Sequence, residues 1–330
     1  TDGNNAAARV LPIPLNLTRN RTNTIIARWC DSAFPDHDPS WSITPPSDLD
    51  SIDESLMVDE QGQPIPRELW QEVANVRCGN MAELVESQLK AFSFNAVGRK
   101  FGEYLGKLGT AILHGPTMRK ATKKQWRAIV GAPTPDNPTG RVLESVRSSV
   151  ERPEAEAINP FDAYPEMAAS IEDCERHHLV KMWSTDQLKQ FKDQGADAAA
   201  IEGLIESGPD LAASIYSTIN DRNTSLSQTD DLKNKYAVWR FDGALTKEEA
   251  ITAGAVTEEY GCERVLCELW HCQGKVLKAK ISPLEDDLRL PFFYVQYERI
   301  DDTMFGVGVP YLYRDTQRAI NATYDAMMTN

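Results

Sequence analysis

The sequence has little that would place the protein in a membrane or outside a cell. No run of about 18 apolar residues, the length that a membrane-spanning helix needs, occurs in the 330-residue chain. The first ten residues lack the charged-then-apolar pattern of a secretory signal. The six cysteines are dispersed through a chain too long to need disulfide bonds for folding. We therefore expect them to be the reduced thiols of a cytoplasmic protein.

The sequence also lacks an excess of basic residues. It has 35 Lys and Arg against 49 Asp and Glu, which gives a net charge of −14. This excludes a nucleic-acid-binding protein that relies on a positive field over its whole surface. It is compatible with a protein past which DNA slides, because a negative channel repels phosphate and reduces sticking.

No cofactor or nucleophile signature is complete. Gly306 and Gly308 begin a glycine pattern, but Tyr311 occupies the position of the third glycine that a dinucleotide-binding loop requires. Near His114 there is no serine or cysteine nucleophile with a partner acid, so this histidine is interpreted as structural. We predict that the protein binds no cofactor and is not an enzyme.

The most metal-like set is Cys262, Cys267, His271 and Cys272. In a strand, Cys267 and His271 would share one face and Cys272 would lie on the other, so the set cannot close a tetrahedron around zinc. The tandem pair at 177 and 178 is too compact for chelation without a third ligand, and its charged neighbours are typical of an exposed helix. We predict no bound metal.

The most informative segment that is present spans residues 291–330. An aromatic, β-prone run at 292–297 predicts a strand, and an acidic loop containing Gly306 and Gly308 follows it. Pro310 then opens a predicted helix, since proline suits the first helical position. A mild apolar face of this helix consists of Leu312, Thr316, Ala319, Ile320, Thr323 and Met327. A different, polar face carries Arg314, Arg318, Asn321 and Asp325.

Three earlier helices are predicted, at 18–34, 66–95 and 97–114. The last of them carries Gly98, Gly102 and Gly106 at intervals of four residues. Each glycine costs a helix about 1 kcal/mol relative to alanine. A row of three therefore indicates close packing of this helix against a neighbour, which another subunit could supply.

One basic cluster stands out at 118–127. Its charged members are Arg119, Lys120, Lys123, Lys124 and Arg127, and Trp126 lies among them. One interpretation is a patch that contacts phosphate groups. The other is a solvated face, or a surface that forms salt bridges within an acidic oligomer.

The middle of the chain changes from helical to β patterns. Residues 131–160 look like a linker, in which 141–150 could form either a strand or a short helix. Residues 165–183, 185–194 and 197–207 are predicted helices, and Ser184 begins a capping sequence for the second. From residue 235 the pattern predicts strands at 236–241, 263–272 and 276–280, the last two forming a hairpin. The prediction for the whole chain is therefore an α+β fold.

Three groups of motifs follow one another in a recognisable order. The first is RTNTIIAR at 21–28, with FPxxDxxWxIxP at 34–45. The second is LGTAILHGPT at 108–117. The third is the apolar strand at 292–297, then TMFGVGVP at 303–310 and RDTQRAIN at 314–321. Together with the hairpin before the third group, this order resembles the portal, or head-to-tail connector, proteins of tailed bacteriophages, especially short-tailed ones.

The resemblance implies a structural protein without catalysis of its own. Such proteins form a ring, typically a dodecamer, at one capsid vertex, and duplex DNA enters and leaves through the ring. The implied partners are the major capsid protein and scaffold, tail adaptor proteins, a terminase motor and passing DNA, with no membrane. The implied location is the virion, after assembly in the cytoplasm of the bacterial host.

The resemblance also implies an arrangement of domains. Residues 1–17 would be an extended arm, 18–234 a mainly helical wing, 235–309 the β-rich part of the wing, and 310–330 the start of a stem helix. The clip, which docks the motor, and the carboxy-terminal crown would lie outside this chain. Arg314, Arg318 and Asn321 would then face the channel or the adjacent subunit.

Two alternatives stay open. A metal-dependent DNA-processing enzyme would need a carboxylate cluster, for which Asp286, Asp287, Asp301 and Asp302 are the candidates. A capsid or tail protein of another type would differ from a portal in its ring symmetry.

Overall fold

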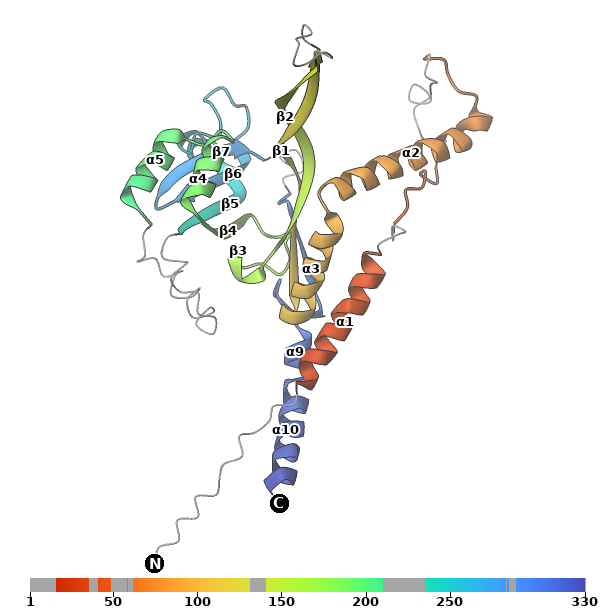
Figure 1. Cartoon of the computed structure of the whole chain (residues 1–330), viewed down its shortest axis with the longest axis vertical. Coiled ribbons are helices and arrows are strands. Elements are labelled where there is room, and N and C mark those ends of the chain that lie inside the picture. The colour runs from red at the N-terminus through yellow and green to blue at the C-terminus, as the bar shows by residue number, and fades with distance from the viewer. Residues whose placement is uncertain are drawn as a thin grey trace, which may run out of the picture. The chain divides into compact units, whose positions relative to one another are not determined.

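The computed structural model (Figure 1) has an α+β fold, as predicted. It describes residues 16–35, 41–48, 58, 62–130, 141–209, 235–282, 284 and 289–329, and only the backbone of residues 116, 118–130, 141–152 and 329. The chain divides into two compact units. The first comprises residues 1–112 and 294–330, and the second comprises residues 113–293. In the described ranges, no helix is both long enough and apolar enough to cross a membrane.

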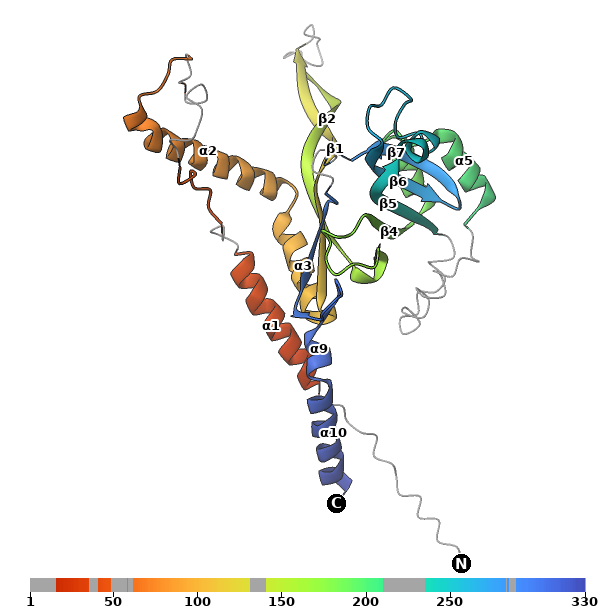
Figure 2. The same ribbon diagram turned by 180° about the vertical axis from the view of Figure 1, so that it is seen from behind.

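The first unit is built from helices that both ends of the chain supply. They are α1 (Leu17–Ala33), η3 (Arg67–Leu69), α2 (Trp70–Ala91), α3 (Phe94–Leu108), α9 (Val309–Leu312) and α10 (Arg314–Thr329). A short hairpin of β9 (Glu298–Arg299) and β10 (Gly306–Val307) precedes α9. Helices α1 and α3 lie side by side in Figure 1 and again from behind in Figure 2.

The glycine row of α3 is the surface on which α1 packs. A Cβ atom on Gly98 would lie 2.6 Å from the ring of Phe34, and one on Gly106 would lie 2.4 Å from Ile26. These distances are too short for any side chain, so the two helices approach closely only because the glycines are there. The neighbour of the row is therefore α1 of the same chain.

A second group of glycines lets two backbone segments meet where α3 ends. Gly109 ends α3 with a left-handed φ of 86°, so the helix predicted over 97–114 stops at Leu108. A Cβ on Gly109 would lie 2.3 Å from the backbone nitrogen of Gly308. The backbone N–H of Gly306 donates to Thr110 Oγ1 at 2.8 Å and fixes this contact. The glycine pattern of the 303–310 motif thus has a packing role.

The second unit contains a five-stranded antiparallel sheet of order β3-β4-β5-β6-β7. Its strands are β3 (Ala163–Pro165), β4 (Arg176–Trp183), β5 (Tyr236–Thr246), β6 (Arg264–Cys272) and β7 (Lys275–Ile281). The helices of this unit are η4 (Pro160–Asp162), α4 (Thr185–Lys192), α5 (Ala198–Ser207) and α8 (Lys247–Thr252). The hairpin predicted near residues 263–280 is confirmed as β6 and β7.

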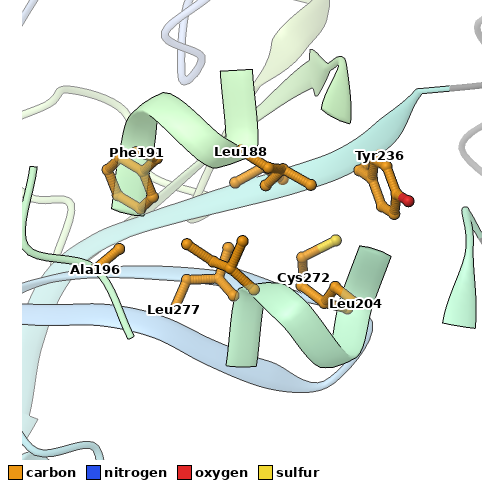
Figure 3. Close-up of a cluster of buried hydrophobic side chains, with 9 residues drawn as sticks. Leu188, Phe191, Ala196, Leu204, Tyr236, Cys272 and Leu277 are labelled. Carbon is orange, nitrogen blue, oxygen red and sulfur yellow. The ribbon is translucent and has the colours of Figure 1, made fainter. Parts of the chain in front are cut away.

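Hydrophobic clusters cover both faces of this sheet. Leu188 and Phe191 of α4 pack with Leu204 of α5 over Leu277 and Cys272 of the sheet (Figure 3). On the other face, Ala250 of α8 packs with Val265 and Cys267 of β6. Because successive side chains of a strand point to opposite faces, Cys267 and Cys272 belong to different clusters.

A second sheet, of order β2-β1-β8, contains β1 (Thr110–Val130), β2 (Arg141–Ile158) and β8 (Phe292–Gln296). The strands β1 and β8 both pass from one unit into the other. At 21 and 18 residues, β1 and β2 far exceed the usual strand length of roughly 3–10 residues.

The structure corrects two predictions for the middle of the chain and decides an alternative that the sequence left open. Residues 176–183, predicted as part of a helix, form β4, because pairing with β5 along the whole strand overrides their helical periodicity. Residues 141–150, for which the sequence left a strand or a short helix open, form part of β2, and this strand continues to Ile158 through residues that were taken as a linker. The region 18–234, predicted as mainly helical, contains β1 to β4 beside its helices.

Candidate assembly and binding surfaces

The predicted site arginines lie on α10, in the first unit. Arg314 Nε and Arg318 Nη1 lie 3.2 and 3.6 Å from Asp315 Oδ1. The Arg314 guanidinium also lies 4.6 Å from the ring centroid of Tyr311. Because the side chains of both arginines are exposed, these ion pairs contribute only about 0–1 kcal/mol. A partner could therefore recruit either arginine at little cost.

Asn321, the third predicted site residue, belongs to the contact between α10 and α1. Gln317 Nε2 donates to Asn321 Oδ1 at 2.9 Å. Gln317 Oε1 in turn accepts hydrogen bonds from the backbone N and Oγ1 of Thr18, at 3.0 and 2.9 Å. Gln317 thus satisfies a first-turn amide of α1, whose N-cap residue Asn16 makes no side-chain cap bond. Asn321 is half-buried beside this contact, whereas the two arginines are exposed.

The apolar face predicted for the last helix is uncovered within the described chain. Leu312 is 42% exposed and Met327 is 73% exposed. Between them, Thr316, Ala319 and Thr323 are exposed as well, and Ile320 is half-buried. A 16-residue helix draws most of its stability from packing of such a face, so this one needs a partner.

Helix α2 presents a second uncovered apolar surface in the same unit. Val76, Met81 and Leu84 are 57–59% exposed, and Trp70 is the buried residue of this helix. Most of the exposed large hydrophobic side chains in the described residues belong to the first unit. Concentrations of this kind mark surfaces that other molecules cover.

The predicted basic patch falls on β1. The backbone there is described, and the side chains of Arg119, Lys120, Lys123, Lys124 and Arg127 lie outside the described part of the structure.

A buried ion network in the second unit was not predicted. Arg240 donates through Nε and Nη2 to the two carboxylate oxygens of Asp242, both at 2.7 Å, and through Nη2 to Glu268 Oε2 at 3.1 Å. Lys280 Nζ lies 3.1 Å from the same Glu268 oxygen, and Trp270 Nε1 donates to Glu268 Oε1 at 2.8 Å. The sequence carried one signal of this network. The two-residue period of a strand places Arg240 and Asp242 on one face of the sheet, and Glu268 lies opposite Asp242 on the next strand.

The network shifts the pKa values of its acids in opposite directions. Burial raises the pKa of Asp242 to about 6, against the attraction of Arg240. Burial also acts to raise the pKa of Glu268, but Arg240 and Lys280 outweigh it and lower that pKa. Removing one member of such a network costs about 3–5 kcal/mol, because it leaves a buried charge uncompensated. Its members hold β5, β6 and β7 together.

Two buried histidines lie in the same unit. The ring of His177 stacks on Phe292 with centroids 3.9 Å apart, and the ring of His114 lies 4.9 Å from the same Phe292 centroid. The structural interpretation of His114 fits its burial, whereas the exposed-helix interpretation of the pair at 177 and 178 is wrong. The side chain of His177 points to a buried side of the sheet, because successive side chains of β4 alternate between the two faces.

The sequence contained several residues that were considered as metal ligands, and the structure places some of them. Within the described residues, no group of three or more His, Cys, Asp or Glu side chains is placed to hold a metal ion. Of the carboxylates considered for an enzyme, Asp301 and Asp302 are exposed in the turn between β9 and β10. Asp286 and Asp287 lie outside the described residues.

Comparison with known proteins gives no independent assignment. No protein-family model matches the chain, and no curated protein sequence matches it.

Proposed function

We propose that the chain is a subunit of a bacteriophage portal, the ring at one capsid vertex through which duplex DNA is packaged and ejected. The observation that carries the proposal is the largely uncovered apolar face that begins at Leu312 of α9 and continues along α10 to Met327. This helix is the last element in the order of strand, glycine loop and helix on which the resemblance to portals rests. In a ring, the face would pack against the neighbouring copy.

The contacts of the motif residues support this role. Gly306 and Gly308 pack against the end of α3, and Gln317 binds the start of α1. The base of α10 is therefore tied to the rest of its unit at two points. A helix that is held at its base and has a largely uncovered apolar face is suited to assembly with copies of itself, as a stem helix requires.

The remaining parts of the proposal follow from the family. The ring would be a dodecamer, without catalysis, in contact with the capsid protein and scaffold, tail adaptors and a terminase motor. The final location would be the virion. The same proposal assigns the two units to the wing of a portal and α10 to its stem.

The test is single-particle imaging of the purified protein without DNA. We expect closed rings with a central hole at least as wide as a DNA duplex. Rings of fixed symmetry without a continuous hole would instead favour a capsid or tail protein of another type. A dimer with Mg²⁺-dependent or Mn²⁺-dependent nuclease activity would overturn the proposal in favour of the enzyme.

A further inference from the structure

The junction of α1 and α10 gathers four arginines in a protein whose net charge is −14. The two helices are joined by the hydrogen bond from Thr18 Oγ1 to Gln317 Oε1, at 2.9 Å. Four exposed arginines lie within three residues of one end of this bond or the other, and they are Arg19, Arg21, Arg314 and Arg318. In segments 16–22 and 311–321 the only acid is Asp315, whereas the chain as a whole carries a net charge of −14.

The position of the first two arginines is unfavourable for α1 itself. Arg19 lies in the first turn of the helix and Arg21 follows it, and the first turn contains no acidic residue. The positive end of the helix dipole disfavours a cation there by about 0.3–1 kcal/mol. Cations kept at a position where they weaken their own helix indicate an anionic partner.

Exposed aromatic rings lie among these arginines. Tyr311 is 59% exposed and carries the Arg314 guanidinium 4.6 Å from its ring centroid, and Tyr313 is 40% exposed. Arginines contact phosphates with paired N–H donors, and an exposed aromatic ring beside them orients a guanidinium group or stacks on an unpaired base. An acidic protein surface would require only the cations. The combination therefore favours nucleic acid over the acidic surface of another copy.

We propose that the α1–α10 junction is a nucleic-acid contact at which Arg19, Arg21, Arg314 and Arg318 bind backbone phosphates without sequence preference. Tyr311 supports Arg314 in this contact. A local patch of this size gives weak, salt-sensitive binding, which an acidic protein tolerates because the positive field acts only within a Debye length of about 8–10 Å. The location of this contact inside a ring rests on the proposed function. The binding of nucleic acid by these arginines does not depend on ring formation.

The decisive variant is the double substitution Arg19→Gln/Arg21→Gln, because no earlier step of the portal proposal uses these residues. The matched control is Arg28→Gln/Arg299→Gln, which removes the same charge from exposed positions of the same unit. Binding to a mixed-sequence DNA duplex is measured by fluorescence anisotropy between about 50 and 200 mM NaCl, the range in which phosphate contacts change affinity strongly. Circular dichroism and imaging of each variant report folding and ring assembly separately.

The parent protein is expected to bind the duplex with an affinity that falls as salt rises. The Arg19/Arg21 variant should bind at least about tenfold more weakly at the lowest salt, and its log–log salt slope should be smaller by about 1.8, or about 0.9 for each lost phosphate contact. The control should keep the parent slope. A parent protein that does not bind, or a control that loses as much as the variant, would overturn the proposal.

Two further outcomes separate this proposal from the proposed function. If the Arg19/Arg21 variant binds DNA normally but no longer assembles, the arginines serve a subunit contact, and the nucleic-acid proposal fails while the portal proposal stands. If the parent binds DNA with the expected slope but forms no ring, the portal proposal fails and the nucleic-acid contact remains.

Discussion

At the scale of single residues, the absence of a side chain decides how closely two helices approach. A Cβ on Gly102 would lie 2.6 Å from Trp29 and 2.7 Å from Cys30 Sγ, both on α1. We expect Gly102→Ala to lower the free energy of unfolding by about 1–3 kcal/mol, because the clash outweighs the better helix propensity of alanine. Urea unfolding followed by circular dichroism measures this change.

The matched control is Gly79→Ala in α2, where an added Cβ would meet nothing within 4 Å. There the gain in helix propensity acts alone, and we expect stabilisation by about 1 kcal/mol. If both substitutions change the free energy of unfolding equally, α1 and α3 are packed less closely than the structure shows.

Buried titratable residues set the pH dependence of the second unit. Burial lowers the pKa of His177 to about 3 and lowers that of His114 well below 6.5. The unfolded chain binds protons at these positions near pH 6.5, so the neutral histidines stabilise the fold fully above that pH and progressively less below it. Asp242 acts in the opposite sense: its raised pKa of about 6 adds stability as the pH falls below 6.

Replacing His177 with phenylalanine should remove part of the acid sensitivity while keeping an aromatic ring against Phe292. Between pH 7 and pH 5, we expect the parent to lose about 2 kcal/mol more unfolding free energy than His177→Phe, since each pKa unit is worth about 1.4 kcal/mol. Thermal and urea unfolding at both pH values test this. His271→Phe, at a half-buried histidine of the same sheet, is the control and should change the pH dependence less. Parallel pH profiles for the parent and His177→Phe would contradict the prediction.

At the scale of elements, the sequence predicted best where local signals are strong. Ser184 Oγ accepts from Gln187 N, and Gln187 Oε1 accepts from Ser184 N, which is the capping box expected before α4. The hairpin of β6 and β7 was found from its turn at Gln273 and Gly274. The strand β4 was missed because what fixes it, pairing with β5 some sixty residues later, leaves no local pattern.

The predicted site residues show the same difference between local signals, which the sequence reveals, and long-range contacts, which it does not. The positions of Arg314 and Arg318 on one polar helix face followed from helical spacing alone. The role of Gln317 could not be predicted, because its partner Thr18 is 299 residues away in sequence. The ion network around Arg240 was missed because charged residues in strands are normally interpreted as solvent-facing, and burial depends on which strands pair.

The uncovered face of α10 leads to a prediction about assembly. Thr323 belongs to the apolar face, whereas the adjacent Ala322 is turned by about 100° toward the charged side. If the proposed ring forms through this face, Thr323→Glu should abolish or strongly reduce its formation, because it places a charge in the proposed contact between copies, and Ala322→Glu should leave it nearly intact. Mass photometry at a fixed protein concentration measures both. Assembly that responds equally to the two substitutions would move the subunit contact away from this face.

At the scale of the whole molecule, charge and apolar surface act against each other. Each copy carries a net charge of −14, and the proposed ring would place many such copies side by side. Their mutual repulsion weakens when salt shortens the Debye length from about 30 Å at 0.01 M to about 8 Å at 0.15 M. Apolar contacts along α10 do not weaken under the same change.

We therefore expect the fraction of assembled rings to rise as NaCl increases from about 10 to about 150 mM, the range over which screening changes most. Mass photometry gives this fraction directly, and Thr323→Glu serves as a control that should stay dissociated throughout. DNA binding at the α1–α10 junction should fall over the same range, since it depends on phosphate contacts. Rings that dissociate as salt rises would show instead that ion pairs hold the copies together. In that case Arg314 and Arg318 would bind the neighbouring subunit rather than DNA.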